Sequence, residues 1–178
     1  MTTRTVGLIG ILSLCAVATA PAAFGADRQN YLMLRLGIFT PTGDLDDTGY
    51  DGGMTVDYVF GHYLESQRII EAEIGDFTAD DGYWRGKVDT TPLRVTLKQL
   101  YPGDGLTPYV EAGLGVYFVD RDTALRDKDD LLFGLHIGGG LNHAINETVF
   151  VGAGVRYTKT EANYVNNLAF TANIGYRF

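Results

Sequence analysis

The sequence predicts an all-β protein, an eight-stranded antiparallel up-and-down transmembrane β-barrel. Three observations predict this fold class. Beyond residue 26, apolar and polar residues alternate with period two in eight segments of about 8–12 residues, the length of a tilted strand that crosses a bilayer. Glycine collects on the polar face of these segments, and aromatic residues recur near the ends of the apolar face. Clusters of Gly, Asp, Asn and Pro separate the segments and indicate turns.

The first four segments alternate clearly, and each has one apolar face. They cover residues 31–39, 54–61, 69–77 and 88–98. Their apolar faces consist of Leu32, Leu34, Leu36 and Ile38, then Val56, Tyr58 and Phe60, then Ile70, Ala72 and Ile74, then Leu93, Val95 and Leu97. We expect Pro92 and Pro108 at strand beginnings, where a missing backbone donor is tolerated.

The last four segments show the same alternation with more glycine on the polar face. They cover residues 108–119, 133–142, 149–158 and 168–178. Glycines of the polar face in the whole chain are Gly37, Gly75, Gly113, Gly115, Gly138, Gly140, Gly152, Gly154 and Gly175. Small residues are useful in a narrow lumen but gain nothing on a solvated surface. The apolar face is therefore expected to meet lipid; a secreted soluble barrel or sandwich, with that face inward, is the alternative.

The first 25 residues are typical of a secretory signal peptide. Arg4 supplies a positive charge, and an apolar run of 13 residues at 6–18 is too short for a transmembrane helix. Ala23-Phe24-Gly25 offers a cleavage site, which leaves residues 26–178 as one barrel domain. A lipoprotein signal at Cys15 is the alternative, although Leu14 stands where such signals have a small residue.

Composition excludes several classes of function. The chain has 178 residues with 14 Lys and Arg against 22 Asp and Glu, so its net charge of −8 disfavours nucleic acid as a partner. The single cysteine lies in the predicted leader, and Ser66 is the one serine beyond it. Neither disulfides nor thiol chemistry is therefore expected in the mature chain.

Several motifs resemble the small eight-stranded outer-membrane barrels of Gram-negative bacteria, the OmpA, OmpX and OmpW type of domain. The motifs are Gly37 with Pro41-Thr42-Gly43-Asp44, Thr91-Pro92-Leu93, the run at 108–115 and the terminal Gly175-Tyr176-Arg177-Phe178. The resemblance implies a bacterial outer-membrane location. It also implies that Ile174, Tyr176 and Phe178 form the signal read by the barrel assembly machinery. The resemblance covers the whole mature chain, but this fold hosts structural, adhesive, channel and enzymatic members.

The expected topology has both termini in the periplasm. Outer loops are then expected at 40–53, 78–87, 120–130 and 159–167, and inner turns at 62–68, 99–107 and 143–148. The outer loops contain twelve acidic residues and six basic ones, so the outer rim is negative. The acids are Asp44, Asp46, Asp47, Asp51, Asp80, Asp81, Asp120, Asp122, Asp127, Asp129, Asp130 and Glu161.

Solvated loops beside lipopolysaccharide are the plain interpretation of these acidic residues, and divalent cations are the possible further partner. The 44–49 run only partly matches a calcium loop, because its twelfth position is Thr55.

Charged residues of the polar face are expected to close the lumen as an ion-pair network. The lumen of eight strands is only wide enough for side chains to fill it, and an unpaired charge there would be costly. We expect Arg94 between Glu73 and Glu111, in one middle layer with Arg35 and Asp57. The predicted network consists of Arg35, Asp57, Glu71, Glu73, Arg94, Lys98, Glu111 and Arg156. Arg177 also falls on this face, and His136 is a possible further member; a polar ion path is the alternative.

A lipid-modifying enzyme on this fold would need a serine nucleophile, a histidine base and an acid that orients the histidine. His136 and His143 lack a serine two positions later, and Ser66 falls in an expected inner turn. No nucleophile, base and orienting acid assemble from these residues, and the histidine spacing offers no metal site. We therefore expect no enzyme, no catalytic residues, no cofactor and no resident metal.

Two function hypotheses follow from the sequence. The first is an integral outer-membrane barrel with a structural or surface-interaction role, in contact with lipid and lipopolysaccharide. The second is a narrow, porin-like channel for small hydrophobic or ionic solutes, as OmpW-type relatives suggest.

Overall fold

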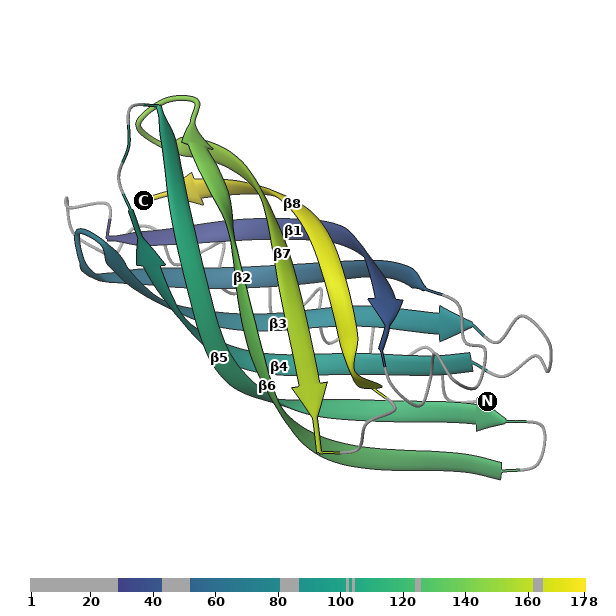
Figure 1. Cartoon of the computed structure of the whole chain (residues 1–178). Coiled ribbons are helices and arrows are strands. Elements are labelled where there is room, and N and C mark those ends of the chain that lie inside the picture. Colours follow the sequence, from purple (N-terminus) through teal and green to yellow (C-terminus); the bar gives the residue numbers. More distant parts are fainter. Residues whose placement is uncertain are drawn as a thin grey trace.

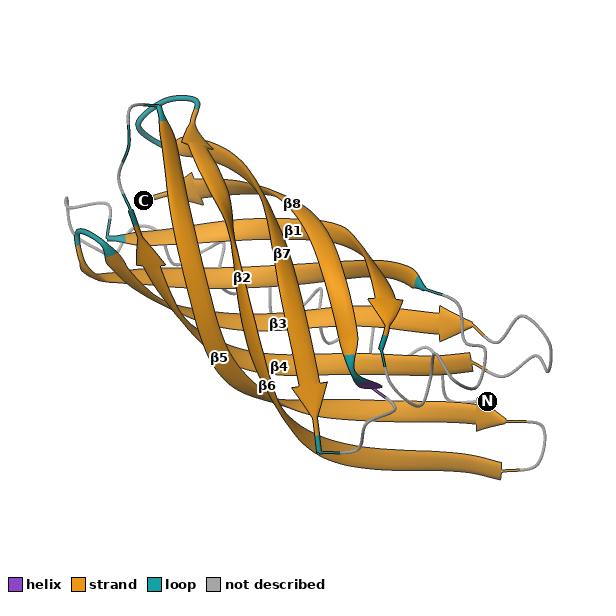
Figure 2. Cartoon of the chain, in the orientation of Figure 1, coloured by secondary structure: helices purple, strands orange, loops and turns teal. Residues whose placement is uncertain are grey.

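The chain folds into a closed antiparallel barrel of eight strands paired in chain order, as predicted (Figure 1). This computed structural model describes residues 29–42, 52–80, 87–101, 103, 105–123, 126–161 and 165–178. Strands make up nearly all of this described part (Figure 2). The strands are β1 (Asn30–Pro41), β2 (Gly53–Glu65), β3 (Arg68–Asp80), β4 (Lys87–Leu100), β5 (Leu106–Thr123), β6 (Arg126–Ala144), β7 (Val149–Thr160) and β8 (Asn167–Arg177). Among the described residues, no helix is long and apolar enough to cross a membrane.

The barrel closes with a stagger of ten residues. A path of paired residues that starts at Tyr31 in β1 returns to β1 at Pro41, ten positions further along the strand. Its intermediate members are Gly61, Glu71, Thr96, Gly113, His136, Thr158 and Asn167. A stagger of this kind requires tilted strands, typically by about 35–45°. Register partners are therefore offset in height, and this offset accumulates from strand to strand around the barrel.

The two ends of the barrel differ in their connections. One end, here called the turn end, holds the turns at 66–67 and 145–148 and the connection between β4 and β5. Asn30 and Phe178 meet at this end, where each backbone N–H donates to the other residue's carbonyl at 3.2 and 2.9 Å. The opposite end, here called the loop end, holds the connections between β1 and β2, β3 and β4, β5 and β6, and β7 and β8.

The hairpin of β5 and β6 corrects the expected third outer loop. Residues 120–130 were expected as a loop, but β5 runs to Thr123 and β6 starts at Arg126, with Val119 opposite Asp130. These strands have 18 and 19 residues, against 11 to 14 in the others, and Figure 1 shows their hairpin extending at the lower right. Eight of the eleven residues at 120–130 are charged, so no apolar face alternates with a polar one and the strand extension has no hydrophobic signal.

Pro92 also departs from the expectation, because it lies inside β4 and not at its beginning. Register pairs between β3 and β4 run from Arg68 and Gln99 to Ile74 and Leu93, and they resume at Phe77 and Thr90. The interruption lies opposite Pro92, which has no N–H to donate to a ladder.

The outward face of the barrel is apolar, as the alternation predicted. Exposed side chains on it include Ile38 at 63 %, Met54 at 68 % and Leu135 at 65 %. Aromatic residues Phe118, Phe133, Phe170 and Tyr176 are also exposed there. A soluble sandwich would bury these residues, whereas a membrane barrel exposes them to lipid.

The lumen contains two apolar clusters that the sequence analysis did not anticipate. The turn-end cluster consists of Tyr31, Met33, Val59, Ile69, Leu100, Tyr109 and Phe150. The loop-end cluster consists of Phe39, Phe77, Ala79, Val88, Tyr117, Val119, Leu132, Val165 and Ala169. Along β1, Arg35 lies between Met33 of the first cluster and Phe39 of the second. The charged layer of the lumen is therefore covered on both sides by apolar side chains.

Candidate functional site

The candidate site is the charged layer in the middle of the lumen. Six of the eight strands place buried charged side chains in it, because inward positions alternate along each strand. None of these side chains belongs to a residue more than 6 % exposed. The set is Arg35, Asp57, Glu71, Glu73, Arg94, Lys98, Glu111 and Arg156, four cations and four anions.

Glu73 is the centre of this network. Its Oε2 lies 3.2 Å from Arg35 Nη1, 3.3 Å from Arg94 Nε and 2.6 Å from Arg156 Nη1. Its Oε1 accepts from Arg156 Nη2 at 3.0 Å and from the Thr96 hydroxyl at 2.6 Å. One carboxylate thus contacts three guanidinium groups, which balances the cost of burying it.

Arg156 connects Glu73 to the second part of the network, around Glu111 and Lys98. Its Nε donates to Glu111 Oε1 at 2.8 Å, and its Nη2 lies 2.7 Å from the same oxygen. Lys98 Nζ contacts Glu71 Oε1 and lies 3.8 Å from Glu111 Oε2. Every one of the eight charges therefore has an opposite charge within 4.0 Å.

The stagger of the barrel corrects the expected position of Arg94. Arg94 was expected between Glu73 and Glu111, but its register partners are Glu73 on β3 and Gly115 on β5. Its second acidic contact is Asp57, to which Nη2 donates. Glu111 lies opposite Lys98 instead. The reason is that the strands are tilted, so equal distance from the strand ends does not mean equal height.

Three uncharged side chains join the network. The Tyr31 hydroxyl donates to Glu71, although Tyr31 was identified only as the start of a strand. Thr96 Oγ1 lies 2.8 Å from His136 Nε2 and donates to Glu73. Because an ionised Glu73 only accepts, His136 must donate to Thr96. In this direction His136 does not accept the Thr96 proton, so the two side chains do not form a hydroxyl nucleophile with a histidine base. The sequence does contain a signal for both residues: Tyr31 lies an even number of positions from Arg35 in β1, and Thr96 lies two positions from Arg94 in β4, so both face the lumen.

Glycines of the polar face give room to the large inward side chains. A Cβ added at Gly61 would lie 2.1 Å from Tyr31 Cζ, and one at Gly75 would lie 2.1 Å from Asp57 Oδ1. In both cases the two residues are register partners on adjacent strands. A large side chain therefore crosses the neighbouring glycine, which lets the narrow lumen hold charged and aromatic groups together.

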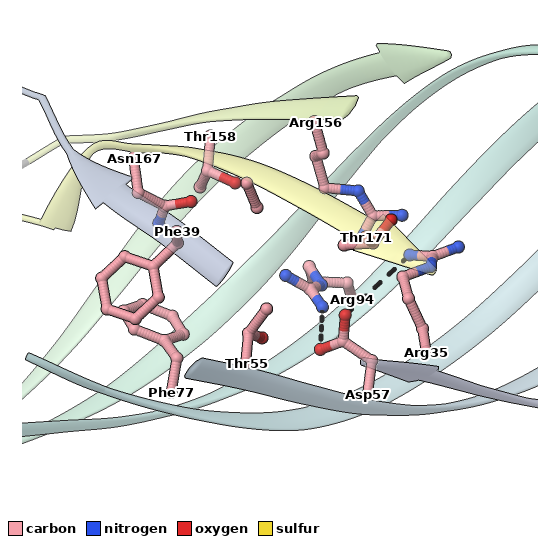
Figure 3. A pocket seen from close by; sticks show the side chains of 11 residues that line it. Arg35, Phe39, Thr55, Asp57, Phe77, Arg94, Arg156, Thr158, Asn167 and Thr171 are labelled. Atoms are coloured by element: carbon pink, nitrogen blue, oxygen red, sulfur yellow. Dashed lines mark hydrogen bonds and ion pairs between the residues drawn. The ribbon is translucent and has the colours of Figure 1, made fainter. Parts of the chain in front are cut away.

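Two small cavities lie on either side of the network. The loop-side cavity has a volume of about 10 Å³ and is lined by Arg35, Phe39, Thr55, Asp57, Phe77, Arg94, Arg156, Thr158, Asn167, Ala169 and Thr171 (Figure 3). The turn-side cavity has about 60 Å³ and is lined by Tyr31, Tyr63, Ile69, Leu100, Thr107, Asn142, Ala144, Phe150 and Arg177. Volumes of this size hold water molecules or small ions, not organic solutes.

The other residues singled out in the sequence lie away from this layer. Ile174 and Tyr176 are exposed on the outward face of β8, and Phe178 is half-buried after its end. Arg177 is at the turn end, with its guanidinium carbon 4.9 Å from the centre of the Phe150 ring. Five of the twelve acidic residues of the expected outer loops, together with the predicted signal peptide, fall outside the described residues; the five are Asp44, Asp46, Asp47, Asp51 and Asp81. Within the described part, no three His, Cys, Asp or Glu side chains are grouped as a metal site.

Several solved structures similar to this chain are bacterial outer-membrane proteins. Neisserial surface protein A (NspA) has a TM-score of 0.70 and 15 % identity, over 87 % of this chain and 100 % of that one. The outer membrane protein OprG from Pseudomonas aeruginosa has a TM-score of 0.65 and 16 % identity, over 84 % and 96 %. The outer membrane enzyme PagL has a TM-score of 0.50 and 17 % identity, over 82 % and 97 %. At these identities the likeness concerns the fold alone.

Comparison at the sequence level gives the family. No match to a curated protein was found. The model of the outer membrane protein β-barrel domain matches residues 9–178, which is nearly the whole chain. Together with the closed eight-stranded barrel and its apolar outward face, this match shows that the chain belongs to the outer membrane protein β-barrel domain family.

Proposed function

We propose that this outer-membrane barrel is a non-enzymatic scaffold with a closed lumen, and that its role is structural or interactive at the cell surface. The observation that carries the proposal is the layered lumen. Eight paired charges lie between two apolar clusters, and the larger of the two cavities beside them has about 60 Å³. Solute flow would require several of these ion pairs to separate in a low-dielectric environment, which is costly.

Single-channel recording in a planar bilayer tests the closed lumen. The purified monomer is expected to give no discrete conductance above the background. A Glu73→Ala, Arg156→Ala double variant is the matched control, because it removes the central pair and leaves a void. Steps from the wild-type monomer as large as those of the control would contradict the proposal.

The loop end is proposed to face outward and to carry the interaction. In this orientation both termini lie in the periplasm after removal of residues 1–25, and Ile174, Tyr176 and Phe178 are available to the barrel assembly machinery. The extended hairpin of β5 and β6 supports the proposal, because residues 126–133 of β6 run past the end of β7 at the loop end (Figure 1). Lipopolysaccharide is the expected neighbour, with divalent cations between its phosphates and the acidic loops.

The sign of the loop charge favours a cationic partner. A structure of Ail, the attachment invasion locus protein of Yersinia pestis, contains the heparin analogue sucrose octasulfate, and it shares this fold with a TM-score of 0.52. The loops of the present chain contain twelve acids and six bases, so a polyanion would be repelled. Binding of the refolded barrel to basic and to sulfated polymers tests this sign: retention of the basic polymer supports it, and retention of the sulfated polymer contradicts it.

A narrow channel for small hydrophobic or ionic solutes is the second candidate function. The observation that favours it is the interrupted pairing of β3 and β4 opposite Pro92, next to Phe77 of the loop-end cluster. A barrel wall with missing ladder hydrogen bonds is a weak point. Uptake of a small apolar dye by vesicles with wild-type barrel, against vesicles with Pro92→Val, separates the candidates. Equal uptake for both proteins speaks against a passage at Pro92.

A further inference from the structure

The loop-side cavity has an unbalanced charge in its lining. Of the four lumen cations in the network, Arg35, Arg94 and Arg156 line this cavity. Of the four anions, only Asp57 does so, and Glu71, Glu73 and Glu111 do not. Figure 3 shows the Phe39 and Phe77 rings at one end of the cavity, Arg35 and Arg156 at the other, and Arg94 between them. The neutral network is thus polarised, with its positive side toward this cavity.

The same cavity has a surplus of hydrogen-bond donors. Among the described buried side-chain atoms that lack a hydrogen-bond partner, those on lining residues are Arg35 Nε, Arg35 Nη2 and Arg94 Nε. All three are donors. Two of them lie near carboxylates outside the cavity, because Arg94 Nε is 3.3 Å from Glu73 Oε2 and Arg35 Nη2 is 3.6 Å from Glu71 Oε2. Arg35 Nε is the donor with neither a hydrogen bond nor an ion-pair contact among the described residues. The carboxylate oxygens in the same condition belong to Glu71 and Glu111, which do not line the cavity. Thr55, Thr158 and Thr171 add three hydroxyl groups to the lining.

We propose that the loop-side cavity binds one monatomic anion, chloride under ordinary conditions. An anion would accept from Arg35 Nε and from the lining hydroxyl groups, beside three guanidinium groups and one carboxylate in the lining, whereas a water molecule would accept the same hydrogen bonds without a charge that these guanidinium groups attract. The volume of about 10 Å³ limits the occupant to a single small species and excludes sulfate or phosphate. Arg35 and Arg94 are at most 5 % exposed, so the site is shielded from solvent and the attraction is strong. This inference is independent of the surface role proposed above.

The apolar rings affect how the site must be tested. Phe39 and Phe77 pack edge to face, with centroids 5.0 Å apart, and they cover the cavity toward the loop end. Exchange of the ion through this cover requires both rings to move. The barrel should therefore be refolded in each salt, so that the anion enters while the lumen is still open.

Bromide is the probe for a direct test. The barrel is refolded and crystallised in sodium bromide, and anomalous scattering at the bromine edge locates the ion. The expected result is one peak inside the lumen, in contact with the guanidinium groups of Arg35 and Arg94. Bromide peaks confined to the protein surface, with a water molecule in the cavity, would overturn the proposal.

Thermal unfolding of two threonine variants gives a second, independent test. The wild-type midpoint is expected to rise with chloride or bromide and to saturate, and to stay flat in gluconate or sulfate of equal ionic strength. Thr55→Val removes a lining hydroxyl and should lose most of this halide-dependent rise. Thr90→Val is the matched control, because Thr90 is also fully buried in the lumen but does not line the cavity. A midpoint that follows ionic strength alone, or equal halide dependence of the two variants, would contradict the anion site.

Discussion

At the scale of single residues, Arg156 joins the two halves of the lumen network. It contacts Glu73 at 2.6 Å and Glu111 at 2.7 Å, so the Arg156→Ala variant leaves Glu111 with Lys98 at 3.8 Å and Arg35 at 3.7 Å. Loss of one partner of a buried ion pair typically costs about 3–5 kcal/mol. We expect a fall of this size in the unfolding free energy, measured by urea titration of the refolded barrel. Lys159→Ala, at an exposed site on the same strand, is the control and should change little.

Gly61 has no side chain, and this leaves the space that the Tyr31 ring occupies. A Cβ at Gly61 would meet the Tyr31 ring, whose hydroxyl donates to Glu71, so Gly61→Ala must displace this ring. Overpacking of this kind costs about 1–3 kcal/mol. In a Tyr31→Leu background the same substitution should cost clearly less, and a double-mutant cycle in urea measures the difference. Additive effects would show that the ring and the glycine are not coupled.

At the scale of elements, the sequence predicts the strands well where one face is apolar. All eight strands and their outward faces follow from period-two alternation, because a shift by one residue would place charges such as Arg35 in lipid. The same signal is silent at residues 120–130, where eight of the eleven residues are charged and neither face is apolar. The predicted position of Pro92 was wrong for a different reason. Strand propensity places proline at strand beginnings, but this barrel wall has an interruption in the β3–β4 pairing opposite Pro92.

The β5–β6 extension should be dispensable for the fold. Val119 and Asp130 are register partners, so residues 120–129 can be replaced by an Asn-Gly turn, which suits a two-residue hairpin. The shortened chain keeps every residue of the lumen network. We expect it to refold with a lower unfolding free energy than the wild type, because residues 120–122 are the β5 partners of Lys87, Val88 and Asp89 in β4. Loss of partner binding by this variant alone would assign the interaction to the hairpin, whereas failure to refold would show that the extension supports the barrel.

At the scale of the whole molecule, the stagger explains why the candidate site could be predicted only in part. The alternation of side chains along each strand selects the eight inward charged residues, and counting from the strand ends suggests which of them share a layer. The closed ladder moves ten residues along β1 in one circuit, so Arg94 meets Asp57 and Glu111 meets Lys98. This shift depends on strand pairing around the full barrel. No local pattern in the sequence contains it.

Closure of the ladder also predicts how the whole protein behaves in SDS. β8 pairs with both β7 and β1, so the described strands leave no open seam along the barrel wall. Detergent can coat the apolar outward face without breaking the ladder, and unfolding must separate the lumen ion pairs and strands together. The unboiled protein should therefore migrate faster in SDS gels than the boiled protein, because the closed barrel stays compact. A chain without residues 167–178 cannot close and should show one mobility at both temperatures. Equal mobility of the boiled and unboiled full chain, with recovery from the soluble periplasmic fraction, would mean that the apolar face does not meet lipid.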